Sequence, residues 1–288
     1  MEDRIFMRNV LRMAMVGLIL LAGCSGSQSG TTPALTPGMP AGGADQPLVL
    51  QTGKVPINWT QFNGPLTGFG PSYAVVVGPD KNMWFSNNQS GLLKVTMTGT
   101  MTPVPLVYVC SGTSNCNYNS GYGITVGADN KFYMTGTNYD YNHSKYVVGQ
   151  ATTTGTLKVF DIPSGDYGSN AGLLKGPDGN VWLLEQAHIG KITPGGTVTE
   201  FAYPSGATSN SGSLTVGADH NIWFTESSQN IVAKIVPASG KITEFALSTS
   251  GLSCSPTGIV SAPDGNLYFN CSYSELGQMT PTGTARQF

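Results

Sequence analysis

The chain has 288 residues, of which only 10% are charged, and its net charge at neutral pH is −2. It contains no basic patch, so we expect no nucleic-acid partner, because nucleic-acid binding needs clustered Lys and Arg. Glycine and proline are abundant, with 38 and 18 residues, and no stretch shows sustained helical periodicity. Short β-branched and aromatic runs between turn residues instead predict an all-β protein.

The first 23 residues have the composition of a secretory signal. Three arginines precede an uncharged apolar stretch over residues 13–23, which is too short to span a bilayer. The stretch ends in Leu21-Ala22-Gly23-Cys24, which resembles the lipobox of bacterial lipoproteins. The resemblance implies that Cys24 is acylated, and Ser25 after it favours anchoring to the outer membrane. The alternative is a short membrane anchor that ends in Cys by chance.

Residues 24–46 are predicted to be a flexible tether, because Gly, Ser, Thr, Pro and Ala dominate there and bury little apolar surface. The folded domain is predicted over residues 47–288. Without Cys24, four cysteines remain: Cys110, Cys116, Cys254 and Cys271. An even number in an exported chain predicts two disulfides. The pairs nearest in sequence are Cys110–Cys116 and Cys254–Cys271, although four cysteines allow three connectivities.

One short motif recurs five times: a small residue, an Asp two positions later, and then an apolar and aromatic run. Its copies begin at Gly78, Gly127, Gly176, Gly217 and Ala262. The steps between them are 49, 49, 41 and 45 residues, close to the period of β-propeller blades. A β-solenoid is the alternative, but its coils are usually shorter.

Each repeat is predicted to contain four antiparallel strands. The first is a short apolar run such as residues 214–216, and the second is the aromatic run, such as 222–225. The third and fourth are represented by residues 189–193 and 197–201. Stacking such units radially buries both faces of each sheet, so we predict a β-propeller. Residues 47–62 resemble two strands of another unit, so the propeller is five- or six-bladed, with five preferred.

The segments 176–185, 189–194 and 197–201 resemble the repeats of the streptogramin B lyase family, also called virginiamycin B lyase. That resemblance implies a propeller, and in the family a seven-bladed one. It also implies a Mg²⁺-assisted elimination that opens the ester-linked ring of an antibiotic. In the family, a His in a Glu-Pro-His-Gly-Ile segment is the general base, and a Glu after an aromatic strand helps to hold the metal ion.

The residues of that reaction do not carry over to this chain. The nearest counterpart of the base segment is Ser255-Pro256-Thr257-Gly258-Ile259, in which Thr257 replaces the His and Ser255 replaces the Glu. The segment Phe269-Asn270-Cys271-Ser272 lacks a carboxylate. The base position in the other units holds Tyr73, Tyr122, Ala171 and Ser213. We therefore predict no catalytic residue.

Two carboxylates remain as candidates for binding a cation or a hydroxyl-rich ligand. Glu185 and Glu226 follow the second strand of the third and fourth units, from where they can face the central channel. The favoured alternative is that they are repeat-consensus residues that accept local backbone hydrogen bonds. His188 and His220 are predicted to be exposed turn residues, and no metal site is predicted.

A segment rich in Tyr and Asn in the second unit is a second candidate for ligand binding. It contains His143 and lies near four tyrosines: Tyr118, Tyr122, Tyr133 and Tyr146. Aromatic faces beside amides suit sugars or peptides. The alternative is an ordinary soluble loop.

The sequence thus predicts a monomeric, lipid-anchored binding module without a cofactor, whose partner is a small molecule, a glycan or an envelope protein. The alternative is a divergent metal-assisted lyase or lactone hydrolase that uses Glu185 or Glu226 with Mg²⁺. An assembly scaffold among envelope proteins is a third possibility.

Overall fold

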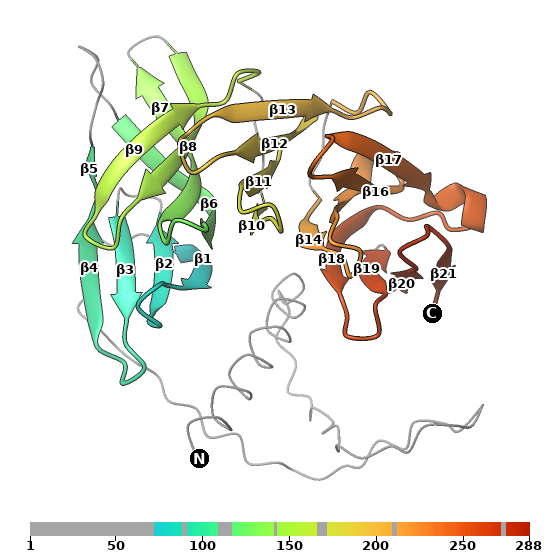
Figure 1. Ribbon diagram of the computed structural model, residues 1–288, viewed down its shortest axis with the longest axis horizontal. Helices are drawn as coiled ribbons and strands as arrows, with labels where there is room; N and C mark the ends of the chain where they lie inside the picture. The colour runs from blue at the N-terminus through green and yellow to red at the C-terminus, as the bar shows by residue number, and fades with distance from the viewer. Residues whose placement is uncertain are drawn as a thin grey trace, which may run out of the picture. The chain divides into compact units, whose positions relative to one another are not determined.

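The computed structural model describes residues 72–87, 91–108, 117–140, 143–165, 172–208, 212–271 and 275–288 (Figure 1). These residues all belong to one unit of the chain, Gly64–Phe288. The predicted signal, tether and early strands, together with Cys110 and Cys116, lie outside the described residues. Within the described ranges, no helix has the length and apolar character needed to cross a membrane.

The described strands form five sheets, one for each repeat, in which strands adjacent in sequence pair antiparallel. The first contains β1 (Ser72–Val77), β2 (Met83–Asn87), β3 (Gly91–Val95) and β4 (Met101–Pro105). The second contains β6 (Asn117–Val126), β7 (Phe132–Asp140), β8 (His143–Ala151) and β9 (Thr156–Asp161). The third contains β10 (Leu173–Lys175), β11 (Val181–Leu184), β12 (His188–Ile192) and β13 (Val198–Ala202).

The fourth sheet contains β14 (Leu214–Val216), β15 (Ile222–Glu226), β16 (Ile231–Val236) and β17 (Lys241–Ala246). The fifth contains β18 (Pro256–Ser261), β19 (Leu267–Cys271), β20 (Glu275–Met279) and β21 (Ala285–Gln287). The short 3₁₀ helix η1 (Ser227–Gln229) lies between β15 and β16, and η2 (Leu247–Ser250) lies between the fourth and fifth sheets. The predicted all-β class and the four strands of each unit are confirmed.

The second sheet has one strand that the sequence analysis did not predict. The short strand β5 (Val107–Tyr108) pairs parallel with β9, opposite Thr156 and Leu157. It lies on the chain between the first and second units, so the segment that connects two repeats extends the sheet of the second.

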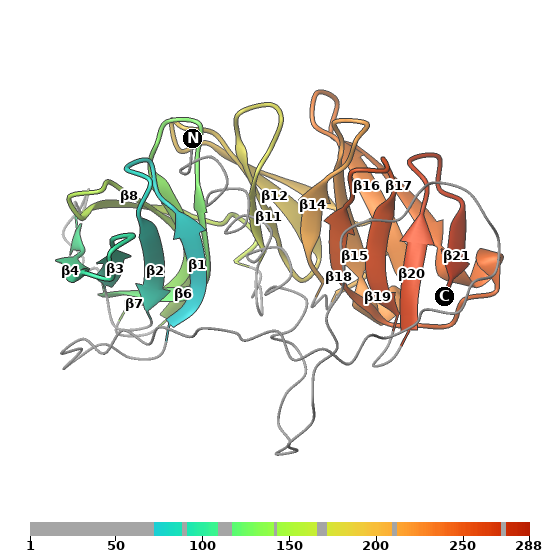
Figure 2. The same ribbon diagram turned by 90° about the horizontal axis from the view of Figure 1, so that it is seen from below.

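The sheets face one another in chain order, as the second view in Figure 2 also shows. The first strand of each sheet contacts the first strand of the next: β1 contacts β6, β6 contacts β10, β10 contacts β14, and β14 contacts β18. The apolar core therefore lies between consecutive sheets, as in a β-propeller. Between the third and fourth sheets it contains Trp182, Tyr203 and Phe224. Residues 47–62, on which the choice between five and six blades depends, lie outside the described residues.

The repeated Asp motif is explained by a turn that ties two strands together. In the fourth unit, Asp219 accepts hydrogen bonds from the backbone N–H of Asn221 at 3.2 Å and from Trp223 Nε1 at 2.9 Å. In the second and fifth units a Tyr hydroxyl donates to the Asp in place of the indole. Gly217 precedes the turn because a Cβ there would lie 2.5 Å from the Trp223 ring.

A second repeated glycine packs each sheet against its predecessor. Gly240, in the turn between β16 and β17, has a φ of +70°, and a Cβ there would lie 2.2 Å from the Phe201 ring of the third sheet. Gly196 and Gly283 occupy the same place in their units and lie against Phe160 and Phe245. These turns therefore need glycine both for backbone conformation and for close contact between sheets.

Candidate functional site

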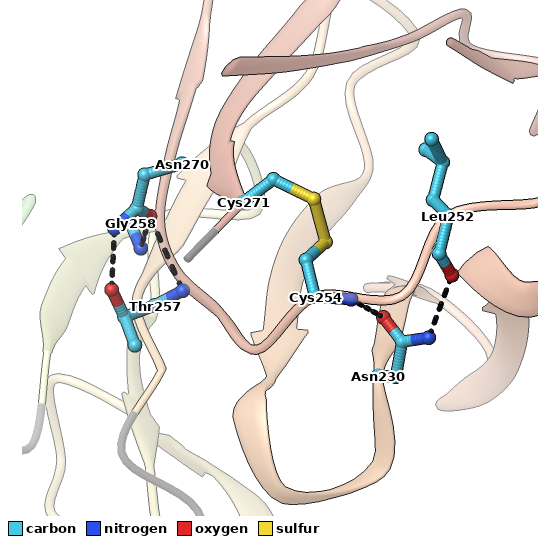
Figure 3. The surroundings of a disulfide bond; sticks show 7 residues. All are labelled: Asn230, Leu252, Cys254, Thr257, Gly258, Asn270 and Cys271. Carbon is cyan, nitrogen blue, oxygen red and sulfur yellow. Dashed lines mark hydrogen bonds between the residues drawn. A yellow bond between two sulfur atoms is a disulfide. The ribbon is translucent and has the colours of Figure 1, made fainter. Parts of the chain in front are cut away.

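Thr257, to which the resemblance assigns the position of the family's base, is exposed at the start of β18. Asn270 on β19 accepts hydrogen bonds through Oδ1 from the backbone N–H of Thr257, at 3.2 Å, and of Gly258. Its Nδ2 donates to Thr257 Oγ1 at 2.6 Å (Figure 3). Asn270 thus fixes both the backbone and the hydroxyl of Thr257. This pair offers no group that takes up a proton near neutral pH.

Next to this pair, Cys271 forms a disulfide with Cys254, with 4.9 Å between the Cα atoms. Asn230 holds the same loop, because its Nδ2 donates to the Leu252 carbonyl and its Oδ1 accepts from Cys254 N–H (Figure 3). The predicted pairing of Cys254 with Cys271 is confirmed. Asn270 and a disulfide-bonded Cys271 therefore stand after the aromatic strand of this unit, and they do not fit the carboxylate ligation that Mg²⁺ requires.

Glu226 is fully buried at the end of β15 and takes part in a junction between the third and fourth sheets. Ser205, in the chain after β13, donates its hydroxyl to Glu226 Oε2 at 2.8 Å. Glu244 on β17 accepts the Ser205 backbone N–H at 2.8 Å and lies beside Glu226. Among the described residues, Glu226 Oε1 has no hydrogen-bond partner. Burial raises the pKa of Glu226 to about 7, opposed by the Ser205 hydrogen bond and reinforced by Glu244.

Glu185 is equally buried, with 1% of its surface exposed, and follows β11 in the third sheet. It lies with His188, the first residue of β12, and Glu200 of β13 in a group whose potential metal-ligand atoms all lie within 4.8 Å of one another. The prediction that His188 is an exposed turn residue is wrong, since it is a half-buried strand residue. We find Glu185 and Glu226 enclosed between sheets instead of open to a channel.

The sequence analysis missed the group of Glu185, His188 and Glu200 because strand register creates it. Glu200 pairs with Gly190, and Gly190 pairs with Leu183, two residues before Glu185. Alternate residues of a strand share a face, so the three side chains meet on one side of the sheet. The glutamate in residues 197–201, which recurs in 241–245, was the available signal.

Three of the four tyrosines named for the second unit do not form the predicted ligand surface. Tyr118, Tyr133 and Tyr146 are buried in the core. Tyr118 donates its hydroxyl to the carbonyls of Met134 and Thr135, and Tyr133 donates to Asp129. They are structural residues because each unit needs large side chains between the sheets. The side chains of Tyr122 and His143 lie outside the described set.

His220 is exposed, with a φ of +58° in the turn before β15, so its predicted place in a turn is confirmed. A small turn residue with positive φ recurs at the corresponding place in other units, for example Asn130. His220 is therefore a turn residue before the second strand, whereas the buried carboxylates stand at the other end of that strand.

Five consecutive four-stranded units, joined by the same turns and the same contacts between sheets, define this chain as a repeat protein of the β-propeller class. A family comparison makes the assignment more specific. The chain belongs to the Virginiamycin B lyase family, whose model matches residues 72–288.

Solved structures agree with this assignment. Selenomethionine-substituted virginiamycin B lyase from Staphylococcus aureus is 24% identical with a TM-score of 0.58, over 75% of this chain and 69% of that chain. A catalytically inactive His-to-Ala variant of the lyase from the same organism, with quinupristin, is 25% identical with a TM-score of 0.58, over 74% and 68%. No curated protein matches the chain.

An extracellular domain of a putative one-component system from B. thetaiotaomicron shares the fold, with 14% identity and a TM-score of 0.50 over 75% of this chain and 31% of that chain. The Cys254–Cys271 disulfide is consistent with export.

Proposed function

We propose that this protein is a lipid-anchored, non-catalytic binding module of the bacterial cell envelope, built on the scaffold of a lyase family. The observation that carries the proposal is the pair formed by Thr257 and Asn270 at the position of the family's base. An elimination needs a base poised near neutral pH, for which histidine is suited. A threonine hydroxyl that already accepts a hydrogen bond from an amide does not replace it.

The buried carboxylates support the same conclusion. Glu226 has a pKa of about 7, which would suit a general base. Its side chain, however, is 0% exposed, and Glu185 is 1% exposed. A base has to reach the proton that it abstracts, so a divergent lyase or lactone hydrolase that uses either residue would need the sheets to separate. This alternative is therefore the weaker one.

The anchor rests on the sequence around Cys24 and on the evidence for export. An acylated Cys24 followed by a flexible tether would hold the domain at the membrane and leave its faces open to a partner. We expect that partner to be a small molecule, a glycan or an envelope protein. Cys24→Ala should abolish incorporation of a labelled fatty acid and release the protein from the membrane fraction. Labelling that persists in this variant would contradict the anchor.

The catalytic part of the proposal is tested with quinupristin and Mg²⁺, with the staphylococcal lyase as a positive control. Chromatography should show no ring-opened product from the purified protein. In parallel, a screen of polysaccharides and envelope proteins should yield a saturable ligand. Ring opening that Glu226→Gln abolishes would overturn the proposal in favour of the divergent lyase.

A further inference from the structure

We propose that Glu185, His188 and Glu200 form a binding site for a divalent transition-metal ion of the zinc type, at the junction between the second and third sheets. The three potential ligand atoms lie within 4.8 Å of one another. Ligands bound to zinc at about 2.0–2.2 Å lie at most about 4.4 Å apart, so small side-chain rotations bring this set to coordination distance. One imidazole and two carboxylates are ligands that zinc accepts.

The backbone holds two of these ligands rigidly. Tyr203, which is buried, donates its hydroxyl to the carbonyls of Glu185, at 2.8 Å, and His188, at 2.6 Å. Glu185 N–H donates to the His188 carbonyl at 2.9 Å, which closes the turn between β11 and β12. The two side chains therefore leave a fixed turn, and a site built in this way is preorganised for an ion.

The sheet beneath provides space for the first carboxylate. A Cβ at Gly190 would lie 2.3 Å from Glu185 Oε1, so only glycine at this place of β12 allows the observed position of Glu185. The third ligand is oriented from the neighbouring sheet, because Ser164, after β9, donates its backbone N–H to Glu200 Oε2 at 3.0 Å. Glu200 is thus held from the second sheet while it belongs to the third.

The fourth sheet offers an internal comparison. In the fourth sheet, Glu244 pairs with Ala233, which in turn pairs with Phe224. In the third sheet, Glu200 pairs with Gly190, which in turn pairs with Leu183. Glu244 is therefore the counterpart of Glu200. Glu226, the counterpart of Glu185, pairs with Ile231. Ile231 therefore stands where His188 stands in the third sheet. Both sheets thus pair two glutamates, but only the third adds an imidazole.

Two close carboxylates in a buried place repel each other unless a positive charge or a proton offsets them. In the fourth sheet, protonation of Glu226 serves this purpose. In the third sheet, the added imidazole completes a set of three ligands, and a cation bound to them would offset the charge of the two carboxylates. This site lies between sheets and needs no substrate, so it is independent of the proposed binding function and of the family's reaction.

The test is calorimetric titration of the chelator-treated, oxidised protein with Zn²⁺ and, separately, with Mg²⁺. We expect one Zn²⁺ per chain and no comparable heat with Mg²⁺, which prefers oxygen ligands. His188→Ile, which copies Ile231 of the fourth sheet, should weaken Zn²⁺ binding about 100-fold or more. Tyr203→Phe should weaken it about 10-fold, as for other residues that orient a ligand.

The control is His220→Asn, which removes an exposed imidazole and places in that turn the residue that stands at Asn130. It should leave the Zn²⁺ affinity unchanged. Zn²⁺ should also raise the melting temperature of wild type and His220→Asn but not of His188→Ile, because an ion that binds only the folded state stabilises it. Melting curves in chelator verify that His188→Ile is folded. Equal Zn²⁺ affinity in wild type and His188→Ile, or no Zn²⁺ binding by wild type, would overturn the proposal.

Discussion

Ser205 Oγ donates a hydrogen bond of 2.8 Å to Glu226 Oε2, from the chain after the third sheet to the second strand of the fourth. The Ser205 backbone N–H also donates to Glu244 at 2.8 Å. Ser164 makes the counterpart of this second contact one unit earlier, where its backbone N–H and hydroxyl donate to Glu200. Pro and Gly flank both serines in the sequence. The segment that leaves one sheet thus contacts a buried or half-buried carboxylate of the next, which links neighbouring units through polar as well as apolar contacts.

The first prediction concerns the stability of Glu226→Gln as a function of pH. The pKa of Glu226 rises from 4.5 to about 7 on folding. Between these values the folded state binds more protons than the unfolded state, so the free energy of unfolding falls as pH rises through this window. Wild type should lose about 3 kcal/mol from this residue by pH 8, whereas Glu226→Gln should not.

Urea unfolding at pH 4.5 and pH 8 measures this difference. Glu275→Gln, which changes an exposed carboxylate, is the control and should follow wild type at both pH values. If Glu226→Gln and wild type lose the same stability between pH 4.5 and pH 8, the buried carboxyl does not titrate as described.

The second prediction compares two glycines with the same backbone conformation. Gly240 and Gly206 have φ values of +70° and +69°, but only Gly240 would bring a Cβ against a neighbour, the Phe201 ring. Gly206→Ala should therefore cost about 1 kcal/mol for the backbone alone. Gly240→Ala should cost about 1–3 kcal/mol more, because it forces two sheets apart. Equal melting temperatures for the two variants would show that this contact between sheets is not tight.

The strands could be predicted from the sequence because each has a strong local signal. The strand predicted over residues 214–216 has the bounds of β14. The strand predicted over residues 222–225 is β15, which is longer by one residue, Glu226. The turn Asp recurs in each unit and the glycine two residues before it in four of the five. In the fourth unit the Asp accepts a hydrogen bond from Trp223, and the glycine leaves room for the ring of the same residue. Local chemistry repeated at a fixed period therefore reveals the fold.

The buried groups could not be predicted, because they depend on how strands pair and how sheets face one another. His188 is the first residue of β12, so an error of one residue in the predicted start of this strand places it in the turn. Glu200 lies close to His188 because of the way in which β12 pairs with β13. Tyr118 and Tyr146 are aromatic residues whose polar neighbours in sequence suggested a surface, yet sheet contacts bury them. A position within a repeat shows which strand a residue belongs to, but not which neighbour covers it.

The third prediction concerns the charge of the turn carboxylates. Burial alone would raise the pKa of Asp219, but hydrogen bonds from Asn221, Trp223 and Lys234 together lower it. Because the pKa is lower in the folded than in the unfolded protein, the ionised Asp219 stabilises the fold at pH values above the ordinary pKa of an Asp. This stabilisation is lost as the pH falls through the folded pKa. Asp219→Asn keeps an acceptor for the indole but loses the ion pair with Lys234, which spans 3.3 Å.

Asp219→Asn should therefore be about 1 kcal/mol less stable than wild type at pH 7, and the difference should become smaller as the pH is lowered to about 2. Asp264→Asn is the comparison variant, because Asp264 is exposed and accepts from Asn266 and Tyr268 in the corresponding turn, which lowers its pKa as well. Its loss of stability should therefore depend on pH in the same direction. Guanidinium unfolding at both pH values measures the effect. An unchanged difference at low pH would mean that packing, and not charge, explains the loss.

The last prediction concerns the disulfide between Cys254 and Cys271, which are 17 residues apart in sequence. Closing a loop of this length stabilises a protein by about 3 kcal/mol, mainly by restricting the unfolded chain. For a domain of this size, each kcal/mol shifts the melting temperature by about 2–4 °C. Replacing both residues by Ser should therefore lower it by about 6–12 °C. Because Asn230 still holds the loop at Leu252, the fold itself should persist.

Reductant should lower the melting temperature of the Cys110→Ser, Cys116→Ser variant by a similar amount, since only Cys254 and Cys271 then remain paired. A variant without Cys254 and Cys271 that melts at the wild-type temperature under oxidising conditions would show that this bond does not stabilise the domain.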